Sequence, residues 1–159
     1  MSLSSNSGLR TATDTDVAAI VDLVNQAFAV ESFFKSGDRI DTTQAIELMK
    51  DGEFLLLTDD GVLTACAYVK LNGDRCYIGL LSVHPGKQRS GIGARMMQEA
   101  EDLGRRAGCR FADIRTVSVR PELSVIYRKL GYIETGVESA AVIKTATMPV
   151  HFVTMSKPL

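Results

Sequence analysis

The sequence predicts an α/β fold of the mixed α+β type, in which a mostly antiparallel seven-stranded sheet with one parallel pair of strands carries four helices on its faces. Three observations support this prediction. Apolar residues switch repeatedly between a helical period and strand-like runs. Turn dipeptides separate three strand-like runs in the middle of the chain. A glycine-containing turn then connects the third run to a long helix, which favours a right-handed crossover to a parallel neighbouring strand.

Length and composition describe one ordinary globular domain over residues 1–159. A chain of this length buries roughly two-thirds of its unfolded surface. The formal charge of −1 argues against a nucleic-acid partner held by bulk charge. No apolar run approaches the ~20 residues of a membrane span, and the first residues lack the apolar core of a secretion signal. We therefore expect a cytoplasmic protein with no nucleic-acid and no membrane partner.

The cysteines, Cys66, Cys76 and Cys109, are odd in number, far apart and set in apolar surroundings. This pattern fits neither a disulfide framework nor a metal site. We expect reduced thiols packed as small hydrophobic side chains, a cytoplasmic compartment and no bound metal.

The first third of the chain predicts a short strand and two helices. Residues 8–16 are typical of a strand that ends in helix-capping residues, with Asp14 or Thr15 as the cap. Residues 28–43 have no regular pattern, and a second short helix is expected over residues 43–50. The first helix has one apolar face, formed by Val17, Ile20, Val21, Val24 and Phe28.

The middle of the chain predicts an antiparallel meander followed by a helix. Residues 53–83 contain three strand-like runs, and the turns at residues 60–61 and 72–74 favour the positive φ angles of hairpins. The helix that follows is expected over residues 94–103 and closes near Gly108.

The last third predicts a strand, a helix and two terminal strands. The strand is expected over residues 109–119, and the helix after it has Pro121 in its first turn and Gly131 beyond its end. The terminal strands are expected over residues 132–138 and 151–156, with a polar surface loop or hairpin between them.

The connection VHPGKQRSGIGARMM, at residues 83–97, is rich in glycine and in cations. A strand that runs through such a turn into a helix gathers free backbone N–H groups at the positive end of the helix dipole, which suits a phosphate or a pyrophosphate. Gly91 and Gly93 let a ligand approach the backbone. Positive charge comes from Lys87, Arg89 and Arg95.

The alternative is a tight strand–helix connection with solvated cations, because short glycine patterns are weak evidence of a ligand. Two familiar nucleotide-binding patterns are excluded. The turn contains no Gly-Lys-Ser/Thr, and the dinucleotide pattern needs a glycine at the position of Met96.

Two motifs together resemble the GNAT superfamily of acyl-CoA-dependent N-acetyltransferases. Residues 88–93, QRSGIG, match Q/R-x-x-G-x-G/A after a strand that ends in SVHP. Residues 124–136, SVIYRKLGYIETG, match Y-x-x-x-G-F/Y with Tyr127, Gly131 and Tyr132. The resemblance covers nearly the whole order of elements. It implies an N-acetyltransferase that moves an acetyl group from acetyl-CoA to a primary amine by direct attack, without a metal.

The resemblance also implies a role for each matching position. Tyr127 would lie near the cofactor sulfur and protonate the leaving thiolate, although a half-buried aromatic that packs on the sheet is the alternative. Where the family often has asparagine this chain has Arg120, which we expect to face the acceptor or the cofactor phosphates. The main chain of Leu81, Ser82 and Val83 would pair with the pantetheine arm and polarise the thioester carbonyl. The pyrophosphate would be held by backbone amides of Gln88, Arg89, Ser90, Gly91, Ile92, Gly93 and Ala94.

The general base that deprotonates the amine stays open between several candidates. The carboxylates are Glu31, in the irregular segment, and Asp113, in the fifth strand. His84 and a chain of water molecules are the other two, although a histidine before a proline at a strand end more often caps the turn. Asp113 and Arg115 share one strand face, either as an ion pair at the sheet rim or as part of the acceptor pocket.

The resemblance places the acceptor between residues 28–43, the fifth strand and the loop before the last strand. We expect a small-molecule amine or amino acid, because no charged docking patch for a protein stands out. A homodimer is one open alternative for the assembly. Two rival functions remain, a non-catalytic acyl-CoA sensor and an α/β protein that binds a phosphorylated metabolite without CoA. Tyr127 argues against the first of these.

Overall fold

One mixed sheet, in the strand order β1-β2-β3-β4-β5-β7-β6, forms the centre of the fold. The structure is a computed structural model that describes residues 7–141 and 143–159. All neighbouring strands are antiparallel except the parallel pair β4 and β5. The predicted fold class is therefore confirmed. The strands are β1 (Ser7–Thr11), β2 (Glu53–Asp59), β3 (Val62–Asn72), β4 (Arg75–Val83), β5 (Phe111–Val117), β6 (Ile133–Ser139) and β7 (His151–Pro158).

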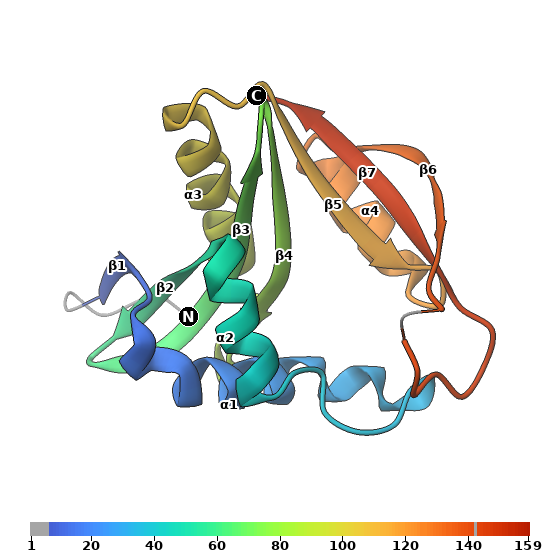
Figure 1. Cartoon of the computed structure of the whole chain (residues 1–159), viewed down its shortest axis with the longest axis horizontal. Coiled ribbons are helices and arrows are strands. Elements are labelled where there is room, and N and C mark those ends of the chain that lie inside the picture. Colours follow the sequence, from blue (N-terminus) through green and yellow to red (C-terminus); the bar gives the residue numbers. More distant parts are fainter. Residues whose placement is uncertain (1–6, 142) are drawn as a thin grey trace.

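Helices cover both faces of the sheet (Figure 1). The apolar sides of α1 (Val17–Phe28) and α2 (Thr42–Asp51) pack on one face of β2 and β3. The opposite face carries α3 (Ile92–Arg106), and Tyr127 of α4 (Pro121–Lys129) packs against the same core cluster. Short 3-10 turns connect these elements as η1 (Asp14–Asp16), η2 (Ala29–Phe33) and η3 (Pro85–Lys87).

The helix cap that the sequence predicts at Asp14 or Thr15 is wrong, because both residues lie inside η1. The backbone N–H of Thr13 donates to Asp16 Oδ2 at 2.8 Å, and Asp16 immediately precedes α1. Arg10 of β1 also pairs with Asp16, at 2.7 Å between Arg10 Nη2 and Asp16 Oδ1. The negative charge at the start of α1 thus comes from Asp16, two residues after Asp14, and is paired with the neighbouring strand β1.

The predicted meander of β2, β3 and β4 is confirmed, and its turns have the expected geometry. Asp60 and Gly61 have φ angles of 53° and 77°, and Gly73 has a φ of 63°. Glycine adopts this left-handed conformation without a steric cost, so glycine favours the tight turns that connect neighbouring antiparallel strands. The local sequence therefore determines this part of the sheet.

The parallel pair β4–β5 is short, and the two strands separate beyond it. Arg75, Cys76 and Tyr77 of β4 are in register with residues 111–113 of β5, and no later pair is formed among the described residues. Leu80 has a φ of 51°, and the register of β3 and β4 shifts at this point. A bulge of this kind bends the strand that carries it. Figure 1 shows β4 and β5 diverging from a common end.

A buried polar contact ties α3 to the strands behind it. The Tyr132 hydroxyl donates to Glu101 Oε2 at 2.8 Å, and Lys157 Nζ lies 2.9 Å from Glu101 Oε1. Tyr132 is 1% exposed and Glu101 is 2% exposed. A buried carboxylate is tolerated only when it is paired and hydrogen-bonded. The second tyrosine of the sequence motif therefore has a structural role in the fold.

Replacing Tyr132 by phenylalanine is expected to lower the free energy of unfolding by about 1–3 kcal/mol, because Glu101 loses a buried donor. Burial and the Glu101 carboxylate raise the pKa of Tyr132. A raised folded-state pKa stabilises the protein fully below the unfolded value of about 10 and less as the pH rises above it. The difference between wild type and variant, measured by urea unfolding, should shrink above that pH. A difference that stays constant to pH 11 would contradict this account.

Candidate functional site

The separated end of β4 forms one wall of the candidate site. Leu81 and Val83 are half-buried against the start of α3, whereas Ser82 is 1% exposed and its hydroxyl donates to the Leu80 carbonyl at 2.9 Å. The Ser82 side chain is therefore occupied, so any contact with a ligand falls to the backbone of this strand. The strand edge on the β5 side is unpaired beyond Tyr77 within residues 7–141 and 143–159.

The turn after β4 is held in shape by its own side chains. Gln88 Nε2 donates to the Val83 carbonyl at 3.1 Å, and the Ser90 hydroxyl donates to the carbonyl of Lys87. Arg89 and Gly91 have φ angles of 63° and 83°. Residues in the left-handed conformation can turn neighbouring backbone N–H groups toward one concave site, and such a site favours an anion.

The start of α3 offers free donors to such an anion. The first backbone hydrogen bond of the helix runs from the Arg95 N–H to the Gly91 carbonyl at 3.1 Å. The N–H groups that precede Arg95 in the first turn therefore have no helical carbonyl to bond with. Gly91 is the N-cap of α3, and within the described part of the chain no side-chain hydrogen bond caps this helix end. Buried Ile92 anchors the turn to the core. Lys87, one of the three cations expected to add positive charge to this turn, pairs with Asp59 at 3.4 Å.

His84 takes the turn-capping role. Its Nδ1 accepts a hydrogen bond from the Gly86 N–H at 3.1 Å, and η3 begins directly after it. This hydrogen bond explains the presence of His84 at the end of β4 without any role in proton transfer.

Arg120 pairs with Glu31, and its charge acts on Tyr127. Glu31 of η2 is 4% exposed, and its Oε2 lies 3.0 Å from Arg120 Nη1. Arg120 stands at the start of α4 and also contacts Glu122 at 3.2 Å. Burial raises the pKa of Tyr127 to about 12, while the positive charge of Arg120 acts in the opposite direction. Arg120 thus pairs with one candidate acid–base group and lowers the pKa of the other.

Asp113 lies elsewhere, in a paired and hydrogen-bonded position. Its Oδ2 and Oδ1 accept from Arg75 Nε and Nη2, each at 2.7 Å, and the Ser156 hydroxyl also donates to it. The hydrogen bond from Arg75 lowers the pKa of Asp113. A carboxylate that is stabilised in this way accepts a proton poorly. Both candidate carboxylates are therefore paired with a guanidinium, Asp113 through two hydrogen bonds and Glu31 through one.

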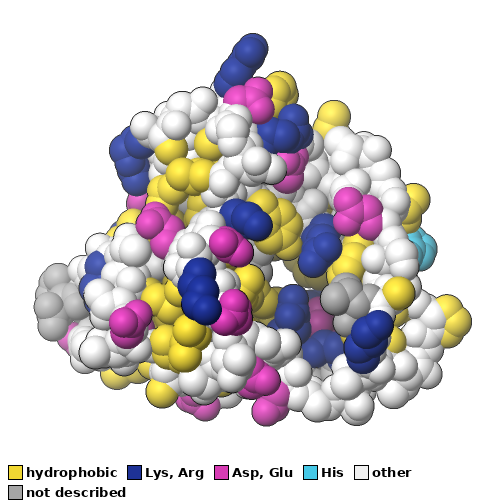
Figure 2. Space-filling view, in the orientation of Figure 1, with side chains coloured by type: hydrophobic (Ala, Val, Ile, Leu, Met, Phe, Trp, Pro, Cys, Tyr) yellow, Lys and Arg dark blue, Asp and Glu magenta, His cyan; other side chains and the backbone are white. Residues whose placement is uncertain are grey.

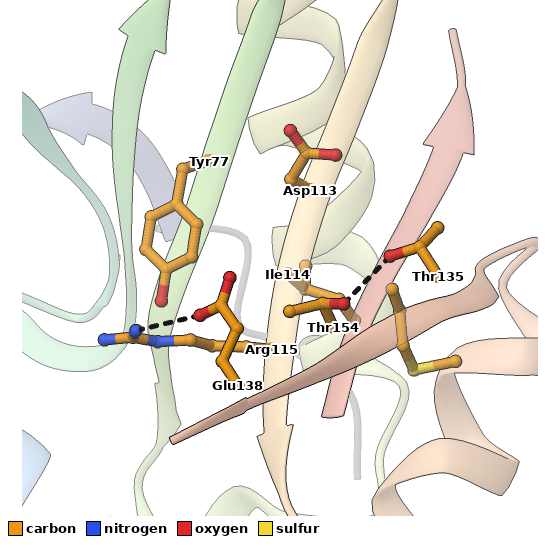
Figure 3. Close-up of a pocket in the computed structure, with 8 residues that line it drawn as sticks. Tyr77, Asp113, Ile114, Arg115, Thr135, Glu138 and Thr154 are labelled. Atoms are coloured by element: carbon orange, nitrogen blue, oxygen red, sulfur yellow. Dashed lines mark hydrogen bonds and ion pairs between the residues drawn. The ribbon is translucent and has the colours of Figure 1, made fainter. Parts of the chain in front are cut away.

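Asp113 and Arg115 do not form an ion pair with each other, which was one of the two alternatives predicted for these residues on one face of β5. Arg115 instead lies 3.8 Å from Glu138 and places its guanidinium 4.2 Å from the Phe152 ring centroid. Both residues nevertheless line a pocket of about 390 Å³ on this face of β4, β5, β7 and β6 (Figure 3). In that view the Arg115 side chain reaches beneath Tyr77. The other lining residues are Ile114, Thr135, Thr154 and Met155.

Replacing Glu31 by glutamine is expected to lower kcat/KM by about 100-fold, the lower end of the effect of one acid–base group. Asp113→Asn should lower kcat/KM less than Glu31→Gln does. Because Glu31→Gln removes the buried one of the two carboxylates that contact the half-buried Arg120, the double variant Glu31→Gln/Arg120→Gln separates stability from catalysis. It should recover thermal stability without recovering activity in a thiol-release assay. Full activity of Glu31→Gln would leave solvent as the base.

The fold is that of known acetyltransferases. The structure superposes on the ribosomal-protein-S18-alanine N-acetyltransferase of Escherichia coli with a TM-score of 0.79 and 16% identity, covering 96% of this chain and 93% of the other. Nourseothricin acetyltransferase gives a TM-score of 0.74 and 18% identity, over 96% and 98% of the two chains.

Sequence comparison gives the family. The family model described as the acetyltransferase (GNAT) family matches residues 17–132, and the chain belongs to this family. Streptothricin acetyltransferase of Streptomyces lavendulae is 30% identical over 107 residues, which are 66% of this chain. The chain spans 57% of the length of that relative.

The described residues contain no helix that is long and apolar enough to cross a membrane. Nor does that part of the chain hold a group of three or more histidine, cysteine or acidic side chains with the arrangement of a metal site.

Proposed function

We propose that this chain is an N-acetyltransferase, which transfers the acetyl group of acetyl-CoA to the primary amine of a small molecule. The observation that carries the proposal is the opening between β4 and β5. It has an unpaired strand edge on one side and the free N–H groups of α3 at one end, and Tyr127 packs against the same core cluster as Leu81 and Val83. A thioester with a long polar arm and a pyrophosphate fits this combination of an edge to pair with and an anion site.

The free N–H groups of the turn and of α3 would hold the pyrophosphate. The space next to Gly93 is not crowded, because the nearest side-chain atom to a Cβ built at this residue lies 3.9 Å away. The backbone of Leu81 to Val83 would hold the pantetheine arm. An N–H group of this strand end, aimed at the thioester carbonyl, would stabilise the oxyanion that forms when the amine attacks.

The reaction proposed is a direct transfer. The neutral amine nitrogen forms a bond with the acetyl carbon, the carbon–sulfur bond breaks, and the leaving sulfur receives a proton from Tyr127. Glu31 takes the proton that the amine loses, directly or through water. An acetyl-cysteine relay is disfavoured, because burial raises the pKa of Cys66 to about 12 and that of Cys76 to about 11.

The acceptor has a second candidate class. The similarity to streptothricin acetyltransferase favours an antibiotic amine, whereas the pocket of about 390 Å³ has the size for a small metabolite or an amino acid. Both are amines, so the same reaction serves either.

A thermal-shift screen followed by a thiol-release assay tests the proposed function. Acetyl-CoA should raise the melting temperature, and one or more amines of a chemically broad panel should release CoA. A shift without any turnover would favour the acyl-CoA sensor. Protection by phosphate esters with none by CoA would favour the phosphometabolite-binding protein.

A further inference from the structure

A strap formed by residues 29–36 crosses the wide end of the opening between β4 and β5. The strap follows α1, which packs on β4 through an apolar cluster that includes Tyr77 and Leu80. Figure 1 shows the light blue segment after α1 reaching under β5, where it meets the orange and red loop between β6 and β7. The strap therefore runs from the group of strands that contains β4 to the group that contains β5.

Main-chain hydrogen bonds attach the strap to the loop between β6 and β7. The Thr147 N–H donates to the Phe34 carbonyl at 2.7 Å, and the Ser36 N–H donates to the Thr145 carbonyl at 3.0 Å. Both bonds join backbone atoms of two extended segments. The attachment is thus a short piece of antiparallel ladder, which does not depend on the rotamer of any side chain.

Side chains attach the strap at two further points. Phe34 is 0% exposed and packs in an apolar cluster with Val117 at the end of β5 and Phe152 at the start of β7. Glu31 is 4% exposed, and its Oε2 lies 3.0 Å from Nη1 of Arg120 at the start of α4. Segments with many buried contacts open less often than loops that have few. The strap is therefore a fixed wall of the opening.

The strap makes the opening a closed ring. At one end β4 and β5 are paired through Arg75, Cys76 and Tyr77. At the other end the strap is anchored to Val117, the last residue of β5. The two strands form the remaining sides. Figure 2, in the same orientation as Figure 1, shows a hollow between β4 and β5 with Lys and Arg side chains around it.

The pocket of about 390 Å³ lies against the anchor of the strap. Arg115 lines this pocket and places its guanidinium 4.2 Å from the Phe152 ring centroid. Phe152 belongs to the cluster that buries Phe34. Glu138, another lining residue, is in register with Phe152. Removing the Phe34 ring would therefore leave a cavity directly behind the wall of the pocket.

We propose that the strap limits the size of the acceptor and that Phe34 sets this limit. The acceptor is then a free small-molecule amine that fits between the strap and the paired ends of β4 and β5, and it is neither a polypeptide nor a bulky antibiotic. A larger acceptor that extends past the end of β5 would collide with the strap and with the loop that the strap holds. The inference rests on the proposed function and specifies its substrate class.

Matched acceptors of two sizes test the limit. Small amines are compared by thiol release with the same amines extended by a bulky amide, and with streptothricin. Wild type should prefer the small member in kcat/KM by about 100-fold or more, since even one methylene too many or too few in a pocket costs about 10–200-fold. Phe34→Ala should reduce this preference tenfold or more by gaining activity with the large member. Phe54→Ala removes an equally buried ring on the α1–α2 face and should leave the preference unchanged.

An engineered disulfide, Lys35→Cys with Ala146→Cys, tests whether the strap is fixed. Lys35 and Ala146 form an antiparallel bridge that the two main-chain hydrogen bonds flank. In such a pair the Cα atoms lie about 4.5 Å apart, within reach of a disulfide. Oxidised glutathione should form this bridge alone, because Cys66, Cys76 and Cys109 are buried. The oxidised protein should acetylate small amines as fast as the same protein after reduction. The product is measured by mass spectrometry, because a reductant interferes with thiol detection.

The outcomes separate this inference from the function on which it rests. If wild type acetylates the extended amines or streptothricin as fast as the small amines, the size limit is overturned and the N-acetyltransferase stands. If folded Phe34→Ala keeps the full preference, the assignment to Phe34 is overturned. If the oxidised disulfide variant loses activity with every amine, the strap is a lid that has to open, and the fixed wall is overturned even where Phe34→Ala does not fold. If acetyl-CoA neither shifts the melting temperature nor is consumed with any amine, the proposed function fails together with the inference.

Discussion

Replacing Tyr127 by phenylalanine is expected to lower kcat by roughly 10²–10⁴-fold and to leave the affinity for acetyl-CoA nearly unchanged. The ring packs against the core cluster of α3 and lies 6.0 Å from the Tyr132 ring, and these contacts remain in the variant. Only the hydroxyl is removed. Burial raises the pKa of this hydroxyl to about 12, so it is protonated at neutral pH. In the proposed reaction it gives this proton to the leaving sulfur.

The loss should be smaller for acyl donors whose thiol is more acidic, because a better leaving group needs less protonation. Tyr68→Phe is the matched control. The Tyr68 hydroxyl donates to the Leu48 carbonyl at 2.7 Å, on the α1–α2 face, so its removal should affect stability and spare kcat. Wild-type kcat in Tyr127→Phe, measured where chemistry limits the rate, would assign Tyr127 to packing alone.

Replacing Gly93 by glutamate should abolish the binding of acetyl-CoA. In wild type, acetyl-CoA at a hundredfold excess over its Kd should stabilise the fold by ~2.7 kcal/mol. The variant places bulk and negative charge at the free end of α3, where the pyrophosphate is proposed to lie, so the thermal shift should disappear.

Gly93 gives a cleaner test than Gly91. Gly91 has a φ of 83°, so any side chain there strains the backbone. At Gly93 an added Cβ meets Val83 Cγ2 at 3.9 Å and Leu81 Cδ2 at 4.0 Å, which are ordinary contacts. Gly93→Ala should therefore fold as wild type and should retain more acetyl-CoA binding than Gly93→Glu. Full acetyl-CoA binding by Gly93→Glu would refute the anion site at this turn.

The sequence predicts those parts of the fold that short-range interactions determine. The meander follows from Asp60, Gly61 and Gly73, and the ends of α4 from Pro121 and Gly131. The cap of α1 was mispredicted because Asp16 is recruited by Arg10, a partner on another element. The position of β7 between β5 and β6 also depends on pairing between distant segments, which no local pattern encodes.

The candidate site divides in the same way. The turn of residues 83–97 is continuous in sequence, so its glycines and cations are visible together. The pocket residues Tyr77, Thr135 and Thr154 come from three strands, and each is ordinary in its own segment. Arg120 and Glu31 are 89 positions apart. Only the tertiary structure shows that this arginine neutralises the carboxylate predicted as the base.

The short register between β4 and β5 has a consequence for how the molecule opens. Apart from those paired residues, the strands β1 to β4 and the strands β5 to β7 are hydrogen-bonded within their own groups. Native proteins open in cooperative units whose boundaries follow such weak seams. Amide exchange at residues 111–117 should therefore proceed at a lower opening energy than in β3. A ligand that pairs with β4 and also contacts β5 should make amide exchange in strands β5 to β7 as slow as exchange in strands β1 to β4.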